Sequence, residues 1–349
     1  MRYSRKCVSE AEGYVPGEQP TDGGYIKLNT NENPYPPSPR VLEALRAAIG
    51  PQARLYPPPT ADRLRDKLAE VYGFSRDEIV VTNGMDELLS LIVRTFVEPD
   101  DTVVVTYPTY MLYEMLVRLH GAKTASYELT EDFSLPDSVF GARGRVLFLS
   151  RPNSPTGTMF DRRLMDRGVR RFDGIVVIDE AYVDFAEDNC LDSVRQCDNV
   201  IVVRTFSKSF SLAGLRVGFG IAHREIVDDL MKVKDSYNVN TLSQIAGIAA
   251  LEDYEYMRNN VEKIKRTRER LASELKAFGF IVPGSQANFL LAVPDGYALS
   301  AEQIYTRLKE EKKILVRYFP MRRLENSIRI TIGTDTEIDA LLDAMKNIL

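Results

Sequence analysis

Five short runs of almost continuously apolar, β-branched residues lie in the middle of the chain and alternate with longer amphipathic stretches. Such runs are typical of strands buried on both faces of a mostly parallel sheet. Between the first two runs, the stretch 85–96 repeats its apolar residues at helical spacing. This alternation predicts an α/β layered domain. The predicted strands are Glu78–Thr82, Thr102–Thr106, Arg145–Ser150, Gly174–Asp179 and Val200–Arg204.

Length and charge narrow the class of protein. A chain of 349 residues with 44% apolar residues is typical of a globular protein of about two domains. Its net charge of −5 offers no field that would attract nucleic acid or an anionic membrane. The longest apolar stretch, residues 88–93, is far shorter than the roughly 20 residues that span a bilayer. Residues 1–6 lead into no apolar core, so we expect no signal peptide and a cytoplasmic location.

Cysteine and histidine are scarce. The chain has three widely spaced cysteines, no CxxC motif and two histidines. We therefore expect neither a disulfide framework nor a metal site.

The last hundred residues follow a different pattern, which predicts a smaller α+β module. A long charged helix is expected at about 251–278, followed by strands near 288–293, 314–317 and 327–332 and helices near 301–311 and 337–349. We expect an N-terminal arm (1–30) that packs on this module, a large domain (31–250) and a small C-terminal domain (251–349).

Each predicted strand is followed by residues of a different chemical kind. Ligands of open α/β sheets bind beyond the carboxyl ends of the strands, so these residues are candidates for one site. In strand order they are the glycine turn 83–87, Tyr110, the segment 151–157, Asp179 with Tyr182, and Ser207 and Lys208 with Arg216.

These groups together match a phosphorylated pyridine aldehyde. Backbone N–H groups of a helix that opens at Met85 and Asp86 can bind its phosphate, helped by the helix dipole. Ser207 would add a hydroxyl donor and Arg216 a bidentate cation.

The remaining groups suit the ring and the aldehyde. Asp179 can keep a pyridine nitrogen protonated, which makes the ring an electron sink. Tyr110 can stack on the ring, and Tyr182 with Asn153 can donate to a phenolate oxygen. Lys208 would form an imine with the aldehyde.

The same motifs resemble a known family. Ser207-Lys208 followed by Arg216, together with residues 83–87 (NGMDE), 152–157 (PNSPTG) and 179–182 (DEAY), is similar to the motif set of the fold-type I PLP-dependent aminotransferases. Residues 28–35 (LNTNENPY), 54–57 (RLYP), 287–291 (ANFLL) and 328–333 (IRITIG) resemble the histidinol-phosphate aminotransferase branch. The likeness extends from about residue 13 to the C-terminus.

The resemblance implies a fold and a cofactor. The fold would be a large domain with a mostly parallel central sheet and a smaller α+β C-terminal domain. The cofactor would be pyridoxal 5′-phosphate (PLP). Lys208 would bind its aldehyde, Asp179 would face its pyridine nitrogen, and Tyr110 and Tyr182 would contact its ring and phenolate oxygen. The backbone amides of Met85 and Asp86 would hold its phosphate with Ser207 and Arg216.

The resemblance also implies a homodimer and a set of residues that contact the substrate. Tyr56 would come from the other subunit and touch the cofactor phosphate. Arg329 would hold the substrate carboxylate, with Arg317, Tyr14 and Asn153 at further substrate-side positions. Ser154 stands where many relatives have asparagine. Either Asn153 or Ser154 then contacts the phenolate oxygen.

The implied reaction is a ping-pong transamination between L-histidinol phosphate and 2-oxoglutarate in histidine biosynthesis, with Lys208, Asp179 and Tyr182 as catalytic residues. Threonine-phosphate decarboxylase and aromatic amino-acid aminotransferase are alternatives of the same fold. A non-catalytic PLP-fold regulator is a third, which the Lys208–Asp179 pair and the phosphate-binding residues disfavour.

Overall fold

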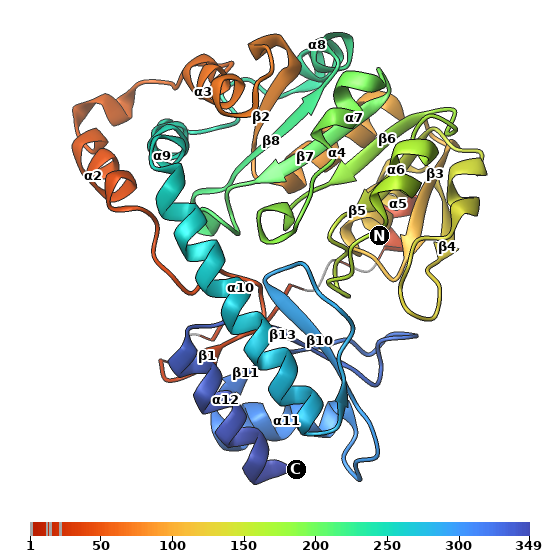
Figure 1. Cartoon of the computed structure of the whole chain (residues 1–349). Coiled ribbons are helices and arrows are strands. Elements are labelled where there is room, and N and C mark those ends of the chain that lie inside the picture. Colours follow the sequence, from red (N-terminus) through yellow and green to blue (C-terminus); the bar gives the residue numbers. More distant parts are fainter. Residues whose placement is uncertain (1–2, 12, 14–15, 21–22) are drawn as a thin grey trace.

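A twisted sheet forms the larger part of the molecule (Figure 1). The computed structural model describes residues 3–11, 13, 16–20 and 23–349. Among these, seven strands form the sheet in the order β2-β8-β7-β6-β5-β3-β4, and β8 is antiparallel to both neighbours while the other pairs are parallel. The strands are β2 (Ile79–Asn83), β3 (Thr102–Tyr107), β4 (Lys123–Glu128), β5 (Val146–Ser150), β6 (Ile175–Asp179), β7 (Val200–Thr205) and β8 (Val217–Ala222). The predicted mostly parallel α/β sheet is confirmed.

Helices cover both faces of this sheet because successive strand residues point to opposite sides. Val103 and Val105 of β3 face α4 (Met85–Phe96), α5 (Leu112–His120) and α8 (Arg224–Val233). Val104 belongs to the apolar core of the other face. Helices on that side are α3 (Asp62–Tyr72), α6 (Arg162–Gly168), α7 (Leu191–Gln196) and α9 (Thr241–Glu252), and α2 (Pro39–Ala48) packs beside α9.

Two strands of the sheet were not predicted. β4 is an edge strand whose sequence KTASYE is polar and largely exposed, so it lacks an apolar signal. β8 contains Gly218 and Gly220, which weaken strand propensity. A Cβ atom at Gly218 would lie 2.4 Å from the backbone nitrogen of Met85, so this glycine lets α4 begin against the sheet.

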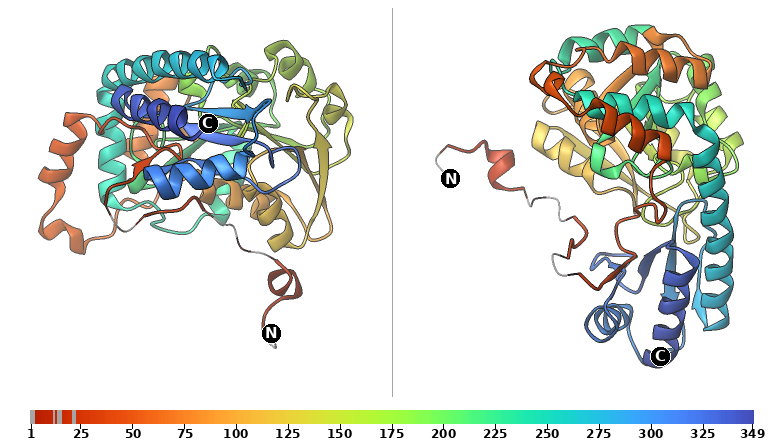
Figure 2. Two further views of the ribbon diagram at one scale, coloured as in Figure 1. Left: turned by 90° about the horizontal axis from the view of Figure 1, so that it is seen from below. Right: turned by 90° about the vertical axis from the view of Figure 1, so that its left-hand side faces the viewer.

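The C-terminal part contains a second, antiparallel sheet of the order β12-β13-β10-β9 (Figure 1). Its strands are β9 (Phe280–Ile281), β10 (Phe289–Pro294), β12 (Arg317–Tyr318) and β13 (Ile328–Thr331), with helices α11 (Ala301–Lys312) and α12 (Asp335–Ile348). The long helix α10 (Tyr254–Ala277) runs along one side of the molecule from the large sheet to this part (Figure 2). The predicted division at residue 250 falls within α9, and it stays a prediction.

The N-terminal segment contacts both parts. β1 (Ile26–Lys27) pairs with β11 (Ile314–Leu315) in the C-terminal part. Upstream, α1 (Lys6–Ser9) lies against α5, where Arg118 donates to the carbonyl of Glu10. Figure 2 shows this short helix at the edge of the molecule. The prediction that the whole arm packs on the small module is not tested beyond these contacts.

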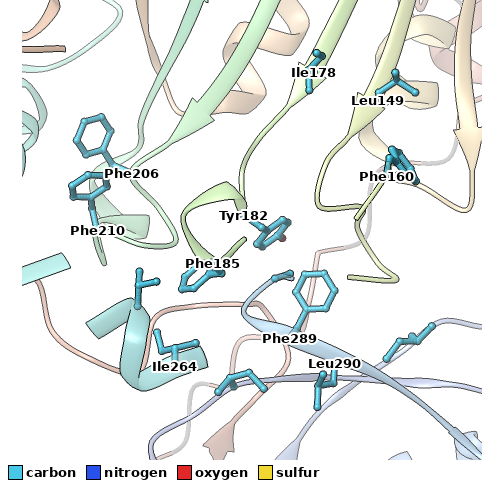
Figure 3. Close-up of a cluster of buried hydrophobic side chains, with 14 of the residues drawn as sticks. Leu149, Phe160, Ile178, Tyr182, Phe185, Phe206, Phe210, Ile264, Phe289 and Leu290 are labelled. Atoms are coloured by element: carbon cyan, nitrogen blue, oxygen red, sulfur yellow. The ribbon is translucent and has the colours of Figure 1, made fainter. Parts of the chain in front are cut away.

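A continuous apolar core joins the two parts (Figure 3). Leu149 and Ile178 come from the large sheet, and Phe289 comes from β10 of the small one. The rings of Tyr182 and Phe289 meet edge to face with centroids 5.1 Å apart. This contact, together with the shared apolar core, joins the small sheet to the segment that follows β6. No helix of the described residues is long and apolar enough to cross a membrane.

Candidate active site

A cavity of about 450 Å³ lies at the carboxyl ends of the parallel strands, between the large sheet, the small sheet and the N-terminal segment. This is where the sequence predicted the site. The structure brings most of the predicted residues to its wall, namely Met85, Asp86, Tyr110, Ser154, Asp179, Tyr182, Ser207, Lys208, Arg216, Arg317 and Arg329.

One end of the cavity is formed by the start of α4. Gly84 precedes the helix with φ +79°, a backbone conformation that favours glycine, and no side chain caps the helix N-terminus. A Cβ atom at Gly84 would lie 2.5 Å from Nη2 of Arg216. The missing side chain therefore lets the guanidinium approach the first turn of the helix.

Arg216 is held at this end by several oxygen atoms. Its guanidinium donates to Ser207 Oγ (3.4 Å) and to the carbonyl of Ala213 (3.3 Å), and it pairs with Asp86 Oδ2 at 3.2 Å. The hydroxyl of Tyr110 donates to the other oxygen of Asp86, at 3.3 Å. The start of α4, the Ser207 hydroxyl and the Arg216 cation thus lie together, and donors of these kinds suit a phosphate.

Asp179 ends β6 and is 2% exposed. The backbone N–H of Ala181 donates to Oδ1 at 2.9 Å, and the hydroxyl of Tyr113 donates to Oδ2. Burial raises the pKa of Asp179 to about 6, and these two hydrogen bonds act in the opposite direction. The sequence did not point to Tyr113, because it is one of several apolar-face residues of α5.

Lys208 lies across the cavity beside Tyr182. Its Nζ donates to the carbonyl of Thr30 at 3.2 Å and lies 5.7 Å from the centre of the Tyr182 ring. The side chain of Asn33 donates to the carbonyls of Lys208 and Ser209, both at 3.0 Å. The segment 28–35 therefore contacts both the backbone of Lys208 and Ser209, through Asn33, and the Lys208 amine, through Thr30.

Asn31 is a second residue that sequence reasoning missed. It is 1% exposed with φ +56°, and its side chain donates to the Tyr182 hydroxyl at 2.9 Å. Its backbone carbonyl accepts from Asn288, and Thr331 donates to its side-chain oxygen. The motif 28–35 was the available signal, but contacts with residues about 150 and 300 positions away cannot be read from it.

Of the two neighbours Asn153 and Ser154, only Ser154 lines the cavity. Asn153 is fully buried, and its Nδ2 donates to the carbonyl of Pro108 (3.1 Å) and to Thr156 Oγ1 (2.8 Å). It is not in the cavity lining, whereas Ser154 is. The roles predicted for Asn153 stay predictions, and its amide nitrogen already donates to its own turn and to the segment between β3 and α5.

The other end of the cavity carries two arginines from the small sheet. Arg317 of β12 and Arg329 of β13 are paired positions of antiparallel strands. Arg317 donates to the carbonyl of Pro16 at 3.1 Å, and Arg329 donates to the carbonyl of Asn29 at 3.0 Å. The centre of the Phe319 ring lies 5.3 Å from Cζ of each.

Two predicted residues are not part of this arrangement. Tyr56 is 81% exposed and stacks on Tyr237 with ring centroids 4.6 Å apart, away from the cavity lining of its own chain. Tyr14 lies outside the described residues.

Comparison with known proteins identifies the family. The model of class I and II aminotransferases matches residues 24–345, which is most of the chain. The chain belongs to the class I and II aminotransferase family. The family predicted from the motifs is therefore confirmed.

Individual members of the aminotransferase family are similar along the whole chain. Histidinol-phosphate aminotransferase of Microcystis aeruginosa is 45% identical over 100% of this chain and 99% of its own length. The enzyme of the same name from Rippkaea orientalis is 44% identical over 99% and 98%. The solved structure of histidinol-phosphate aminotransferase from Sinorhizobium meliloti, in complex with pyridoxal 5′-phosphate, has a TM-score of 0.91 at 24% identity and covers 100% of this chain and 99% of its own.

PLP is the cofactor of this aminotransferase family, and the residues of the cavity fit it. The uncapped N-terminus of α4, Ser207 and Arg216 form an anion site at one end. Lys208 and the buried carboxylate of Asp179 line the same cavity, so an amine for the aldehyde and an anion for a protonated ring nitrogen are both present.

Proposed function

We propose that this aminotransferase transfers the amino group of L-histidinol phosphate to 2-oxoglutarate in histidine biosynthesis. The observation that carries the proposal is the Arg317–Arg329 pair at the end of the cavity away from the phosphate site of the cofactor. The names of the relatives at 44% and 45% identity support the same substrate.

Two guanidinium groups at paired strand positions favour an anion between them or near them. Like charges directly opposite one another on antiparallel strands destabilise a sheet. A phosphate dianion or a carboxylate relieves that repulsion and accepts bidentate hydrogen bonds from arginine. Histidinol phosphate presents a phosphate and 2-oxoglutarate a carboxylate, so one pocket would serve both half-reactions.

PLP, when bound, supplies an electrophilic aldehyde and an electron-withdrawing ring. The amine of Lys208 would take the proton from the substrate Cα as general base and give it, as general acid, to the carbon that carried the cofactor's aldehyde. The carboxylate of Asp179 would keep the ring nitrogen protonated, and Tyr182, whose hydroxyl accepts from Asn31, would donate to the phenolate oxygen. Arg216, Ser207 and the start of α4 would hold the cofactor phosphate.

The N-terminal segment would exclude water from this chemistry. Pro16, Gly17 and Gln19 line the cavity opposite the large sheet. A Cβ atom at Gly17 would lie 2.4 Å from the side chain of Thr30, so the segment packs closely there. Water exclusion strengthens the electrostatic interactions inside the cavity.

We further propose a homodimer in which Tyr56 of each subunit reaches the cofactor phosphate of the other. Tyr56 and Tyr237 expose a stacked pair of aromatic rings, and nearby Leu55 is 53% exposed. Exposed apolar and aromatic side chains that lie together are a feature of protein–protein interfaces. The cytoplasmic location also stays a proposal.

A single half-reaction tests the substrate. The PLP-loaded protein is mixed with L-histidinol phosphate without any oxo acid, and conversion of bound PLP to pyridoxamine phosphate is followed by absorbance. We expect stoichiometric conversion, reversed by 2-oxoglutarate. O-phospho-L-threonine and L-tyrosine serve as parallel substrates. Release of carbon dioxide from phosphothreonine without transamination of histidinol phosphate would refute the proposal.

A further inference from the structure

The phenol of Tyr113 is built into the wall behind Asp179. Tyr113 is the second residue of α5 and its side chain is fully buried. Its ring stacks on Phe148 of β5 with centroids 4.8 Å apart and planes 10° apart. The ring of Tyr110 meets it edge to face at 5.6 Å. The ring is stacked and fully buried, and its hydroxyl donates to Oδ2 of Asp179, with Ser150 as a second hydrogen-bond partner of the same hydroxyl.

The surroundings of Asp179 oppose its ionisation. The carboxyl group is almost completely buried, and the negative charges of Asp86 and Glu180 raise its pKa further. Among the described residues, the donors to this carboxylate are the Ala181 N–H and the Tyr113 hydroxyl. The charged and titratable groups near it are Asp86 on α4, Tyr110 and Tyr113 on the β3–α5 segment, Glu180 and Tyr182 after β6, and Lys208 and Arg216 after β7.

We propose that Tyr113 is a positioning residue that keeps Asp179 ionised and oriented toward the pyridine nitrogen of the cofactor. The inference rests on the proposed function, because it concerns the carboxylate that would pair with the ring of PLP. Tyr113 contacts neither cofactor nor substrate in this assignment, since it is absent from the cavity lining while Asp179 is part of it. It acts through Asp179.

The phenol suits this task because it stays a donor. Burial and the neighbouring Asp179 raise the pKa of Tyr113 well above its ordinary value of 10.0, so the hydroxyl keeps its proton between pH 5 and about pH 9. A hydrogen bond from a neutral donor to a charged acceptor stabilises the ionised form by an amount that corresponds to about one to two pKa units.

The variant Tyr113→Phe removes this donor while keeping the stacked ring. PLP affinity of the apoprotein is titrated from pH 5 to pH 9 by absorbance. Below the pKa of Asp179, affinity falls because binding a protonated ring nitrogen then requires loss of a proton from the carboxyl group. In Tyr113→Phe we expect that fall in PLP affinity to begin about one to two pH units higher than in wild type.

Two controls separate this effect from a general disturbance. Tyr107→Phe removes a hydroxyl that donates to the carbonyl of Arg322 at 2.8 Å, away from Asp179, and should leave the pH profile unchanged. In an Asp179→Asn background, Tyr113→Phe should not change the pH dependence of PLP affinity, because no carboxyl group is left to titrate at position 179. An unshifted profile in Tyr113→Phe, or an equal shift in Tyr107→Phe, would overturn the inference.

A measurement on the unmutated apoprotein covers the case in which Tyr113→Phe does not fold. Infrared difference spectra against Asp179→Asn should show a phenol C–O band that shifts at the pH at which the carboxyl group protonates. A phenol C–O band whose position does not change during this titration would overturn the inference. If wild-type protein binds no PLP at any pH, the proposed function fails together with the inference about Tyr113. If wild type binds PLP but its pH profile does not depend on Tyr113, only the inference fails.

Discussion

Arg317 and Arg329 lie at paired positions of the antiparallel strands β12 and β13, and both side chains line the cavity that contains Lys208. Each donates to a backbone carbonyl of the N-terminal segment, that of Pro16 and that of Asn29. The pair therefore connects the small sheet and the N-terminal segment at the end of the cavity away from Arg216.

Replacing Arg329 by alanine should weaken both half-reactions. In the proposed function one pocket serves the phosphate of histidinol phosphate and the carboxylate of 2-oxoglutarate, so we expect the KM of both to rise at least about tenfold, and Arg329→Lys to recover part of the loss. Arg322→Ala, which removes an exposed partner of Glu128, is the control. Steady-state kinetics with each substrate varied in turn measure the effect. A rise in the KM of only one of the two substrates would mean that the two anions bind at different sites.

Lys208→Ala should lower turnover by about 10² to 10⁴ or more, because no other amine lines the cavity among the described residues. The fold should persist, since the Lys208 amine is held by a hydrogen bond to a single backbone carbonyl, that of Thr30. Borohydride treatment of the PLP-loaded wild type, followed by peptide mapping, should locate the cofactor on Lys208. Lys263→Ala, on the surface of α10, is the matched control. Near-normal turnover in Lys208→Ala would refute the assigned role.

The free energy of unfolding of the apoprotein should depend on the ionisation of Asp179. Its pKa of about 6 in the folded protein exceeds the ordinary 3.8, so the native state binds more protons than the unfolded state between these values. Stability is thus lost as the pH rises through about 6, by about 3 kcal/mol over the whole window.

Urea unfolding at about pH 5.0 and about pH 7.5 measures this dependence. Between these two values we expect wild type to lose about 1 kcal/mol more than Asp179→Asn, in which nothing titrates at this position. Asp179→Asn should also cost orders of magnitude in turnover because the ring nitrogen loses its anion. Equal pH slopes in the two proteins would contradict the raised pKa.

Gly84→Ala should damage cofactor binding. The new Cβ would meet Arg216 at 2.5 Å in a backbone conformation with φ +79°, so the guanidinium must move out of the phosphate site. We expect PLP affinity to fall by at least about tenfold and stability by about 1 kcal/mol. At Gly141, which has no atom within 4 Å of an added Cβ, the same change should have little effect. Unchanged PLP affinity in Gly84→Ala would argue against a phosphate site here.

Mixing two inactive variants tests the shared site. If Tyr56 completes the site of the other subunit, a dimer of one Lys208→Ala and one Tyr56→Ala subunit contains one intact site. Random exchange in an equal mixture should restore about one quarter of wild-type activity. The test requires that Tyr56→Ala alone is strongly impaired. A mixture no more active than its parts would mean that each subunit completes its own site.

Local sequence pattern determined much of this protein. Apolar β-branched runs placed β2, β3, β5, β6 and β7 within one or two residues, because strands buried on both faces need apolar side chains at every position. The groups that follow these strands were predictable candidates for one site, since parallel strands end at the same edge of a sheet. Strand β4, with its polar exposed sequence, and glycine-containing β8 were not predictable in this way.

Only the tertiary structure decided which polar groups meet. Tyr113 contacts Asp179 across 66 positions, Asn31 contacts Tyr182 across 151, and Arg317 faces Arg329 through strand pairing. The amide of Asn153 lies inside the protein rather than in the cavity lining, where it donates to Thr156 of its own loop and to the carbonyl of Pro108, 45 positions away between β3 and α5. Such contacts depend on how the elements pack. The sequence determined which chemical groups were available, and the packing of the two sheets and the N-terminal segment determined their partners.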